Sequence, residues 1–478
     1  MNRYNKNRLL RGLLFVGLIT GGGACRVSEK YTRPEQNMPD HYREYAAATV
    51  DTANMAGKMP WRIVSGDAEL VTLIDSAIHN NLDLRNAIKS IEVAEKILGQ
   101  AKLGNIPELS LQLSAAITRP SDNSLSGISA SQFLGSKYVK DYQTALSLSW
   151  EADIWGKIRS QKEAALAGYL QSTEAARAIQ TQVVAAVAQS YFNLLMLDEQ
   201  RRIAKDNLVL NDSTLNVIRL QRDAGLATTL AVQQAEAQRL NSALLIPQLE
   251  QNIALQESAL SLLIGEMPKA IDRRQNIYRV QLQEQYNAGV PANLLSNRPD
   301  VRASELALIS ANARVGISKA AMYPSLTITA AGGLNTFEAS NWFSVPGSLF
   351  ATAAGAITQP IFLRKQLRTQ YEIAKIEREQ FAIDFRKSVL VAVAEVTDAL
   401  VKVDKIIEQE RIEQTRVETL KSAVKNARLL YSSGMADYLE VLTAQATALQ
   451  SELNLADIKR QRLSILVELY RSLGGGWR

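Results

Sequence analysis

The chain contains an internal duplication, which restricts its architecture more than any other feature of the sequence. A helical pattern begins around Asp83 and ends at Pro107, where a run of alternating apolar and polar residues follows. The same succession begins around Asp300 and ends at Pro324, so both pairs of positions are 217 residues apart (300 − 83 and 324 − 107). Matched helix and strand signals at a constant offset predict one architectural unit that the chain uses twice.

Four segments alternate between apolar and polar residues, as strands do. They cover residues about 107–118 and 142–154 in the first copy, and about 325–332 and 348–360 in the second. Residues 119–141 are rich in Ser, Gly and Asn and are predicted to form a loop. Each alternating segment has about ten residues, the length that a tilted strand needs to cross a bilayer.

A membrane-spanning sheet would require several copies of this chain. After the N-terminal segment, no stretch approaches the ~18–20 apolar residues that a membrane-spanning helix needs. In a bilayer, only a closed β-barrel would then satisfy the backbone hydrogen bonds. Four strands cannot close a barrel, whereas three chains would supply twelve, an even number within the usual range. The strand count therefore requires oligomerisation, and three chains would be enough to close a barrel.

Long helical tracts separate the strand pairs. Between Gly156 and about Asp223 the chain has no proline and one glycine, which predicts a helix on the order of 100 Å long. In the second copy, apolar residues recur at steps of four and three and predict a seam between packed helices. These residues are Val389, Val393, Val396, Leu400, Val403 and Ile407. Gly225 and Gly434, offset by 209 residues (434 − 225), predict turns at helix ends, because glycine accepts left-handed dihedral angles.

The first 24 residues have the features of a secretory signal, with a basic start, an apolar stretch and then small residues. The next residue is Cys25, the only cysteine, at the point where lipoprotein processing would attach acyl chains. Gly22 stands where such sites usually have leucine, so ordinary signal cleavage beside an incidental cysteine is the alternative. Without this segment the chain has 50 basic and 48 acidic residues, and this balance gives no electrostatic case for binding nucleic acid.

Several motifs, in their order and spacing, resemble the TolC-like outer-membrane factor family, and in particular its lipoprotein branch that serves efflux pumps. The resemblance covers essentially the whole chain. The motifs are Trp61 with Asp67 and Leu70, and the segments 81–84, 148–157, 262–268, 297–305 and 473–477. It implies a homotrimer in contact with outer-membrane lipids. Its fold would be mainly α-helical with a transmembrane β-barrel: a trimeric, twelve-stranded barrel continuous with a long helical periplasmic tunnel. A mixed α/β belt near residues 267–297 and the C-terminal tail should surround the tunnel.

The sequence pattern of each copy therefore predicts the same order of elements: helix, strand, strand, helix, helix. We expect the chain to divide into a signal peptide (1–24), an extended lipidated leader (25–60), a first repeat (61–297) and a second repeat (298–478). The tunnel helices are expected at about 156–266 and 364–473.

Similar proteins close the periplasmic mouth of the tunnel at the two helix turns and meet a periplasmic adaptor protein there. The resemblance implies that the adaptor-contacting residues are Gly225, Leu226, Ala227, Gly434, Met435 and Ala436. It also implies a periplasmic gate at Glu440, Thr443 and Tyr431. Relatives narrow the mouth with rings of acidic side chains, and Glu440 keeps that charge at one position whereas Thr443 lacks it at the other. Alternatively, Glu440 is only a solvated carboxylate near a helix N-terminus, which the helix dipole favours.

Tyr431 occupies the place of a tyrosine that locks the turns in relatives. Its usual acidic partner aligns with Ala231, and a second locking arginine aligns with Ala436. The family's locking contacts therefore cannot be transferred to this chain as a set.

These features predict the outer-membrane channel of a tripartite efflux system, which would passively export drugs and other toxic small molecules. Its partners would be a periplasmic adaptor and an inner-membrane RND-type pump. The alternatives are an exit channel for protein secretion, and a structural periplasmic coiled coil, for which the strand pairs have no use. Catalysis is not expected, because His41 and His79 are the only histidines and no metal-binding or phosphate-binding motif occurs. No cofactor is expected.

Overall fold

The computed structural model describes residues 27, 29–35, 37–40, 42, 60–64, 67–280, 282 and 290–477. These residues form two compact units. The first unit takes its described residues from Met1–Pro34, Val93–Leu170 and Leu306–Ile383, and the second from Glu35–Glu92, Gln171–Glu305 and Asp384–Arg478. Within the described part of the chain, no helix is both long enough and apolar enough to span a bilayer.

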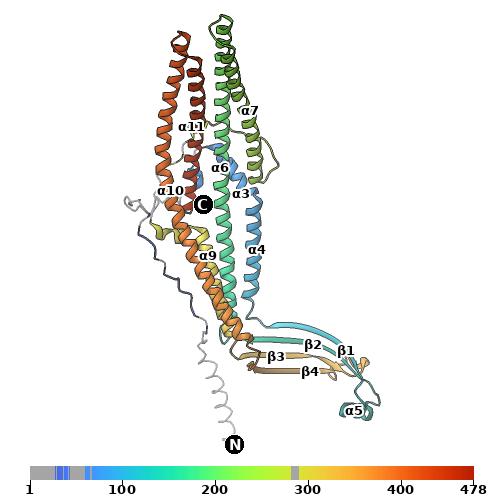
Figure 1. The fold of residues 1–478 in the computed structure, drawn as a ribbon. Helices are drawn as coiled ribbons and strands as arrows, with labels where there is room; N and C mark the ends of the chain where they lie inside the picture. The colour runs from blue at the N-terminus through green and yellow to red at the C-terminus, as the bar shows by residue number, and fades with distance from the viewer. Residues whose placement is uncertain are drawn as a thin grey trace. The chain divides into compact units, whose positions relative to one another are not determined.

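The first unit contains a four-stranded antiparallel sheet with the strand order β1-β2-β3-β4 (Figure 1). The strands are β1 (Glu108–Thr118), β2 (Val139–Ala152), β3 (Ser325–Thr336) and β4 (Leu349–Thr358). Each copy of the repeat supplies one hairpin, and the two hairpins join through β2 and β3. Among the described residues, β1 and β4 therefore each pair on one side only, and their outer edges keep free hydrogen-bonding groups.

The connection between β1 and β2 differs from the predicted loop, because it contains helix α5 (Leu125–Leu134). Ser124 caps the start of α5 by accepting a hydrogen bond from the Gly127 N–H at 3.1 Å. Gly135 ends it in the left-handed conformation, with φ 60°. The composition indicated a loop because Ser and Gly are frequent in turns. Here the same residue types serve as the N-cap and C-cap of a short helix.

The four longest helices display the duplication directly. Helices α6 (Lys157–Asp223) and α10 (Gln366–Ser432) have 67 residues each, and α7 (Thr229–Leu263) and α11 (Tyr438–Ser472) have 35 each. At ~1.5 Å per residue the longer helices measure about 100 Å. Each long helix turns back into its shorter partner, and in the second unit the two turns lie at the same end (Figure 1).

The buried seam of α10 differs in part from the predicted one. Val389 and Val396 are buried as expected, whereas Ile407 is 45% exposed. The seam runs instead through Phe385, Val389, Ala392, Val396, Ala399 and Ile406, all less than 7% exposed. Steps of four and three are preserved, but alanine replaces bulkier residues at alternate positions. The register therefore depends on how closely the helix backbones approach, which apolar periodicity alone does not specify.

Shorter helices attach to this bundle through polar caps. Asp67 caps α3 (Ala68–Asn80) by accepting a hydrogen bond from the Glu69 N–H at 2.9 Å, and its other carboxylate oxygen accepts one from the Tyr191 hydroxyl at 2.8 Å. Asn81 separates α3 from α4 (Leu82–Lys102) and donates to the Leu263 carbonyl at 2.9 Å. Both polar residues are buried, so their hydrogen bonds fix where α3 lies on the longer helices.

Candidate functional site: paired helix turns, belt and two-faced sheet

The two helix turns are nearly identical in geometry. Gly225 and Gly434 both have φ 73°, a left-handed conformation that side chains disfavour. After Gly225, the Leu226 N–H donates to the Gln221 carbonyl at 2.8 Å; after Gly434, the Met435 N–H donates to the Leu430 carbonyl at 2.9 Å. This is the Schellman pattern of helix termination, repeated in both copies. It presents Leu226 and Met435, which are 79% and 72% exposed, at the tip.

A small apolar cluster joins the two helix pairs just below the turns. Its buried members are Leu215, Ile218, Ala231, Val232, Ala235 and Leu442, with Ala227, Tyr431 and Tyr438 packed against them. Three of the four helices contribute buried residues, so the cluster links the first-copy pair to α11. We call this set of residues the tip cluster.

Hydrogen bonds between the copies surround the tip cluster. The Tyr431 hydroxyl donates to Oε1 of Gln221, and the Tyr438 hydroxyl donates to Oε1 of Gln234 at 2.7 Å. Deeper in the bundle, Nε2 of the buried Gln445 donates to Oγ1 of Thr214 at 2.9 Å. Burial, together with the negative charge of nearby Asp437, raises the pKa of Tyr431. The neutral Tyr431 hydroxyl, which donates the bond to Gln221, is therefore the favoured form.

The predicted gate residues fall into two groups. Tyr431 lies in the tip cluster, as does Ala227. Glu440 and Thr443 lie on the exposed side of the first turns of α11, and Glu440 has no ion-pair partner among the described residues. One protomer therefore brings neither of them to the tip cluster. Cys25, the predicted lipidation site, lies outside the described residues.

Sequence reasoning missed the partners Gln221, Gln234, Tyr438 and Gln445. The resemblance pointed to position 231 for the partner of Tyr431, and alanine at that position left the closing contacts undetermined. The structure places a glutamine ten residues earlier, on the other arm of the turn. A search for long polar side chains on both arms would have found Gln221 and Gln234, but it could not have distinguished them from solvated residues.

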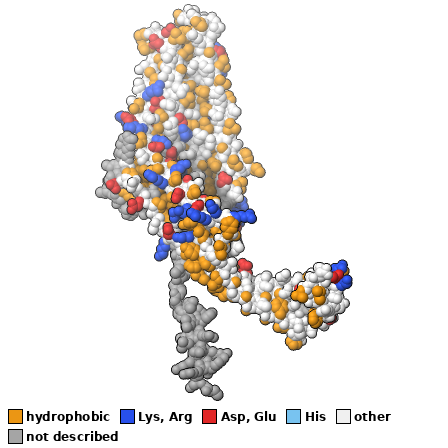
Figure 2. Space-filling model, turned by 60° about the horizontal axis from the view of Figure 1, so that its bottom comes forward, with side chains coloured by type: hydrophobic (Ala, Val, Ile, Leu, Met, Phe, Trp, Pro, Cys, Tyr) orange, Lys and Arg blue, Asp and Glu red, His pale blue; other side chains and the backbone are white. Residues whose placement is uncertain are grey.

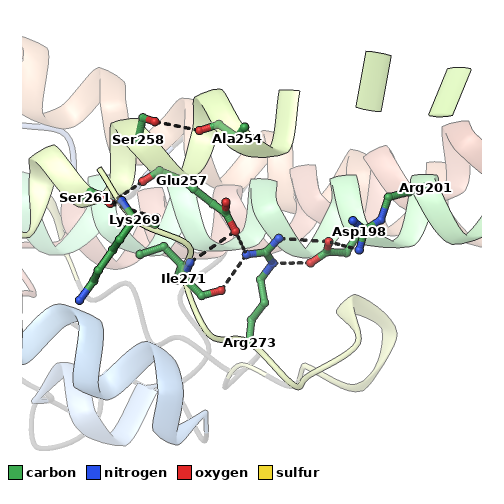
Figure 3. Close-up of polar contacts among 9 residues, drawn as sticks. All are labelled: Asp198, Arg201, Ala254, Glu257, Ser258, Ser261, Lys269, Ile271 and Arg273. Atoms are coloured by element: carbon green, nitrogen blue, oxygen red, sulfur yellow. Dashed lines mark hydrogen bonds and ion pairs between the residues drawn. The ribbon is translucent and has the colours of Figure 1, made fainter. Parts of the chain in front are cut away.

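The belt segment is held by an arginine between two helices (Figure 3). The Arg273 guanidinium is 10% exposed and forms ion pairs with Asp198 of α6 and Glu257 of α7. It also donates to the Ile271 carbonyl at 2.8 Å. The two carboxylates raise the pKa of Arg273 against the opposing effect of burial. This clamp fastens the segment before the 3-10 helix Ile277–Arg279 onto the bundle.

The C-terminal tail packs too closely to accept side chains. A methyl group on Gly475 would overlap the Tyr470 ring, and one on Gly474 would lie 2.5 Å from the Asn297 carbonyl oxygen. Beyond them, the Trp477 ring stacks on the Arg177 guanidinium, 4.6 Å from its centroid. Only glycine lets the tail backbone approach its neighbours this closely. This close packing accounts for the predicted contribution of the C-terminal tail to the belt.

The sheet has two faces of opposite chemistry. Paired residues of an antiparallel ladder share a face, and successive residues alternate between faces. One row across the sheet is Leu109, Leu148, Ala330 and Ala353; the adjacent row on the other face is Ser110, Ser147, Ala331 and Thr352. The first face continues with Leu111, Leu113, Ile117, Leu146, Ile328, Leu349 and Ile357, all more than a third exposed. An exposed apolar face of this extent is typical of a surface that another apolar phase covers.

Aromatic residues mark both ends of the apolar face. Trp150 and Tyr142 lie on it eight residues apart, which is about 26 Å along β2. Tyr142 contacts Trp342 with ring centroids 5.2 Å apart, and Trp155 contacts Tyr323 at 4.8 Å. Figure 2 shows few charged side chains over the sheet and a group of them at its outer tip. An apolar band between two aromatic girdles is the pattern of a lipid-facing sheet.

The chemistry of these sites favours packing and hydrogen bonding. In the part of the chain that the structure describes, no group of three or more His, Cys, Asp or Glu side chains is arranged to hold a metal ion. In the belt segment, Arg273 pairs with Asp198 of α6 and Glu257 of α7, and Lys269 pairs with Glu266.

Comparisons with known proteins agree with one another. The family model described as "Outer membrane efflux protein" matches residues 73–266 and 290–475. Outer membrane protein OprJ of Pseudomonas aeruginosa is 31% identical over 466 residues, 95% of this chain and 94% of that protein. Probable outer membrane lipoprotein SilC of Salmonella typhimurium is 28% identical over 458 residues, 95% of this chain and 96% of that protein. The open-state crystal structure of the Neisseria gonorrhoeae MtrE outer membrane channel matches with a TM-score of 0.84 and 25% identity, covering 95% of this chain and 99% of that one.

Proposed function

Because this chain belongs to the outer membrane efflux protein family, we propose an assembly, a gate and an anchor that enable it to act as a channel. The protein is an outer-membrane component of a tripartite efflux system, with a tunnel extending into the periplasm, and it is a channel rather than an enzyme. The predicted fold class and localisation are confirmed, and the protein-secretion alternative is not favoured. Members of this family form trimers and work with adaptors and inner-membrane pumps.

Three chains close their sheets into one barrel of twelve strands. The observation that carries this proposal is the four-stranded sheet itself, which has an exposed apolar face, a polar face and two open edges. In lipid, open edges leave backbone groups without partners, at a cost of several kcal/mol each. Pairing β4 of one protomer with β1 of the next removes every edge, turns the apolar face toward lipid and lines the lumen with Ser, Thr, Gln and Asn.

The gate lies at the helix turns. Tyr431 and Tyr438 hold the second copy against Gln221 and Gln234 of the first, and opening breaks these bonds and separates the helix pairs. In the trimer, three Glu440 side chains surround the mouth with Thr443 one helical turn further along. Facing carboxylates repel one another and favour cations over anions. The exposed position of Glu440 supports this assignment.

The tip is also the contact surface for the adaptor. Leu226 and Met435 project from the two turns, and no described residue covers them. An adaptor that presents apolar helical hairpin tips would bury these side chains and could separate the turns.

The inner-membrane partner would be an RND-type pump, which supplies the energy. The cargo would be drugs and other toxic small molecules, which the channel conducts passively.

The leader anchors the protein through acyl chains on Cys25. SilC, whose name describes an outer membrane lipoprotein, aligns over 95% of this chain. Palmitate labelling of the wild type and of Cys25→Ser tests this point, and a wild type without label would refute it. The division into a signal peptide (1–24), a leader (25–60) and two repeats (61–297 and 298–478) belongs to the same proposal.

Two adjacent residues of β4 test the channel assembly. Ala353 lies on the apolar face and Ala354 on the polar face, and both are exposed. A lysine in the middle of a lipid-facing strand costs about 2–4 kcal/mol, whereas a lumenal lysine costs little. In a gene-deletion strain sensitised to drugs, Ala354→Lys should restore trimers and resistance, and Ala353→Lys should not. Equal rescue by both variants would refute the orientation of the sheet. Unchanged drug sensitivity after deletion would refute the efflux role.

A further inference from the structure

A basic cavity lies in the first unit, and its lining residues belong to neither the gate nor the belt. It encloses about 280 Å³ between α9 (Pro299–Ala320) and α10. Its charged lining residues are Lys319, Lys375, Arg378 and Glu29. Three cations therefore face one carboxylate in a space large enough for a small polar group.

Glu29 belongs to the N-terminal leader and enters this cavity from outside the helices. Asn312 Nδ2 donates to the Glu29 carbonyl at 3.2 Å, and Arg378 lies 3.9 Å from the Glu29 carboxylate. Among the described residues, Lys319 and Lys375 have no ion-pair partner. Lys375 rests over the Tyr371 ring, with Nζ 5.9 Å from the centroid. The leader thus neutralises one of the three positive charges and leaves two.

One cation of the cavity, Lys319, lies close in sequence to the end of the sheet that the Trp155 and Tyr323 pair marks. Lys319 precedes Tyr323 by four residues, and Lys375 is nine residues into α10, about 14 Å from its start. Aromatic girdles lie at the level of lipid headgroups. Cations clustered beside such a girdle face the phosphate layer of the bilayer, where each basic residue attracts anionic lipid.

We propose that Lys319, Lys375 and Arg378 form a binding site for the phosphodiester headgroup of a membrane phospholipid, next to the docked leader. The two unpaired ammonium groups and the Arg378 guanidinium contact the phosphate oxygens, and the Tyr371 hydroxyl is a further donor. Cys25 precedes Glu29 by four residues, at most about 14 Å of extended chain. Acyl chains on Cys25 would therefore reach the same lipid layer. The site does not depend on how the gate operates.

Binding can be measured with the full-length protein in a non-ionic detergent by native mass spectrometry, with short-chain phosphatidylglycerol as the probe. Lys319→Gln/Lys375→Gln should weaken binding at least tenfold. The matched control, Lys425→Gln/Arg428→Gln, removes two exposed positive charges near the other end of α10 and should bind as the wild type does. Equal binding by the two double variants would overturn the proposal, provided that both elute as trimers with the wild-type melting temperature.

Glu29→Gln provides a test of opposite sign. Removing the one carboxylate that competes for the cations should tighten binding roughly threefold to tenfold. If the Glu29→Gln substitution only disturbed the packing of the leader, binding of the lipid would weaken. A lipid affinity that is unchanged or weaker than that of the wild type would therefore contradict the site. Inorganic phosphate and a short-chain diacylglycerol without phosphate complete the experiment. If inorganic phosphate binds as tightly as the lipid, the site takes free anions. If the diacylglycerol binds as tightly as the lipid, the contact is apolar. Either result refutes a headgroup site.

Discussion

Removing the hydroxyl groups of Tyr431 and Tyr438 should release the helix turns without disturbing the fold. The Tyr431→Phe/Tyr438→Phe variant keeps both rings against the tip cluster and deletes only the bonds to Gln221 and Gln234. A neutral hydrogen bond contributes about 1 kcal/mol net. Two bonds give about 2 kcal/mol per protomer, which is roughly a 30-fold shift toward the open arrangement. If three protomers open together, the shift reaches about 6 kcal/mol.

Single-channel conductance in planar bilayers measures this shift. The wild type should show small, rare openings, and the double variant should show larger and longer ones. Tyr278→Phe, which removes a hydroxyl from the belt, is the matched control and should conduct as the wild type does. If the double variant keeps wild-type conductance while remaining a trimer, the tyrosine–glutamine bonds do not hold the turns, and the proposed gate is wrong.

Four further outcomes follow from the same contacts. Glu440→Gln should reduce the preference for cations in bi-ionic reversal potentials, and an unchanged preference would place Glu440 away from the mouth. The pKa of Tyr431 is raised, so its contribution to the closed tip is complete below pH ~10 and is lost as pH rises through the raised value. Conductance of the wild type should therefore increase in strong alkali, whereas that of Tyr431→Phe/Tyr438→Phe, which lacks both hydroxyls, should not. Gly475→Ala should lower the melting temperature through a clash costing about 1–3 kcal/mol, whereas Gly99→Ala, with nothing within 4 Å, should not. Arg273→Met removes the ion-pair partner of the partly buried Glu257 and leaves Asp198 with Arg201 alone, so the belt should become sensitive to limited proteolysis at a cost of roughly 2–3 kcal/mol; wild-type protection would refute the clamp.

Local sequence determined the repeated elements of this protein. Strand alternation follows from the period of two, and the turns at Gly225 and Gly434 follow from the left-handed conformation that glycine permits. The equal lengths of α6 and α10 and of α7 and α11 repeat the duplication that the constant offsets revealed. These features depend on neighbouring residues, so the sequence alone was sufficient to predict them.

Tertiary structure decided every pairing between distant segments. Tyr431 and Gln221 are 210 residues apart, and nothing near either one identifies the other. Arg273 resembles any exposed arginine until α6 and α7 bring two carboxylates to it. The α10 seam passes through Ala392 rather than the larger Val393, a choice that side-chain size alone does not predict. Periodicity specifies which side of a helix is apolar, whereas the partner it meets depends on how the whole chain packs.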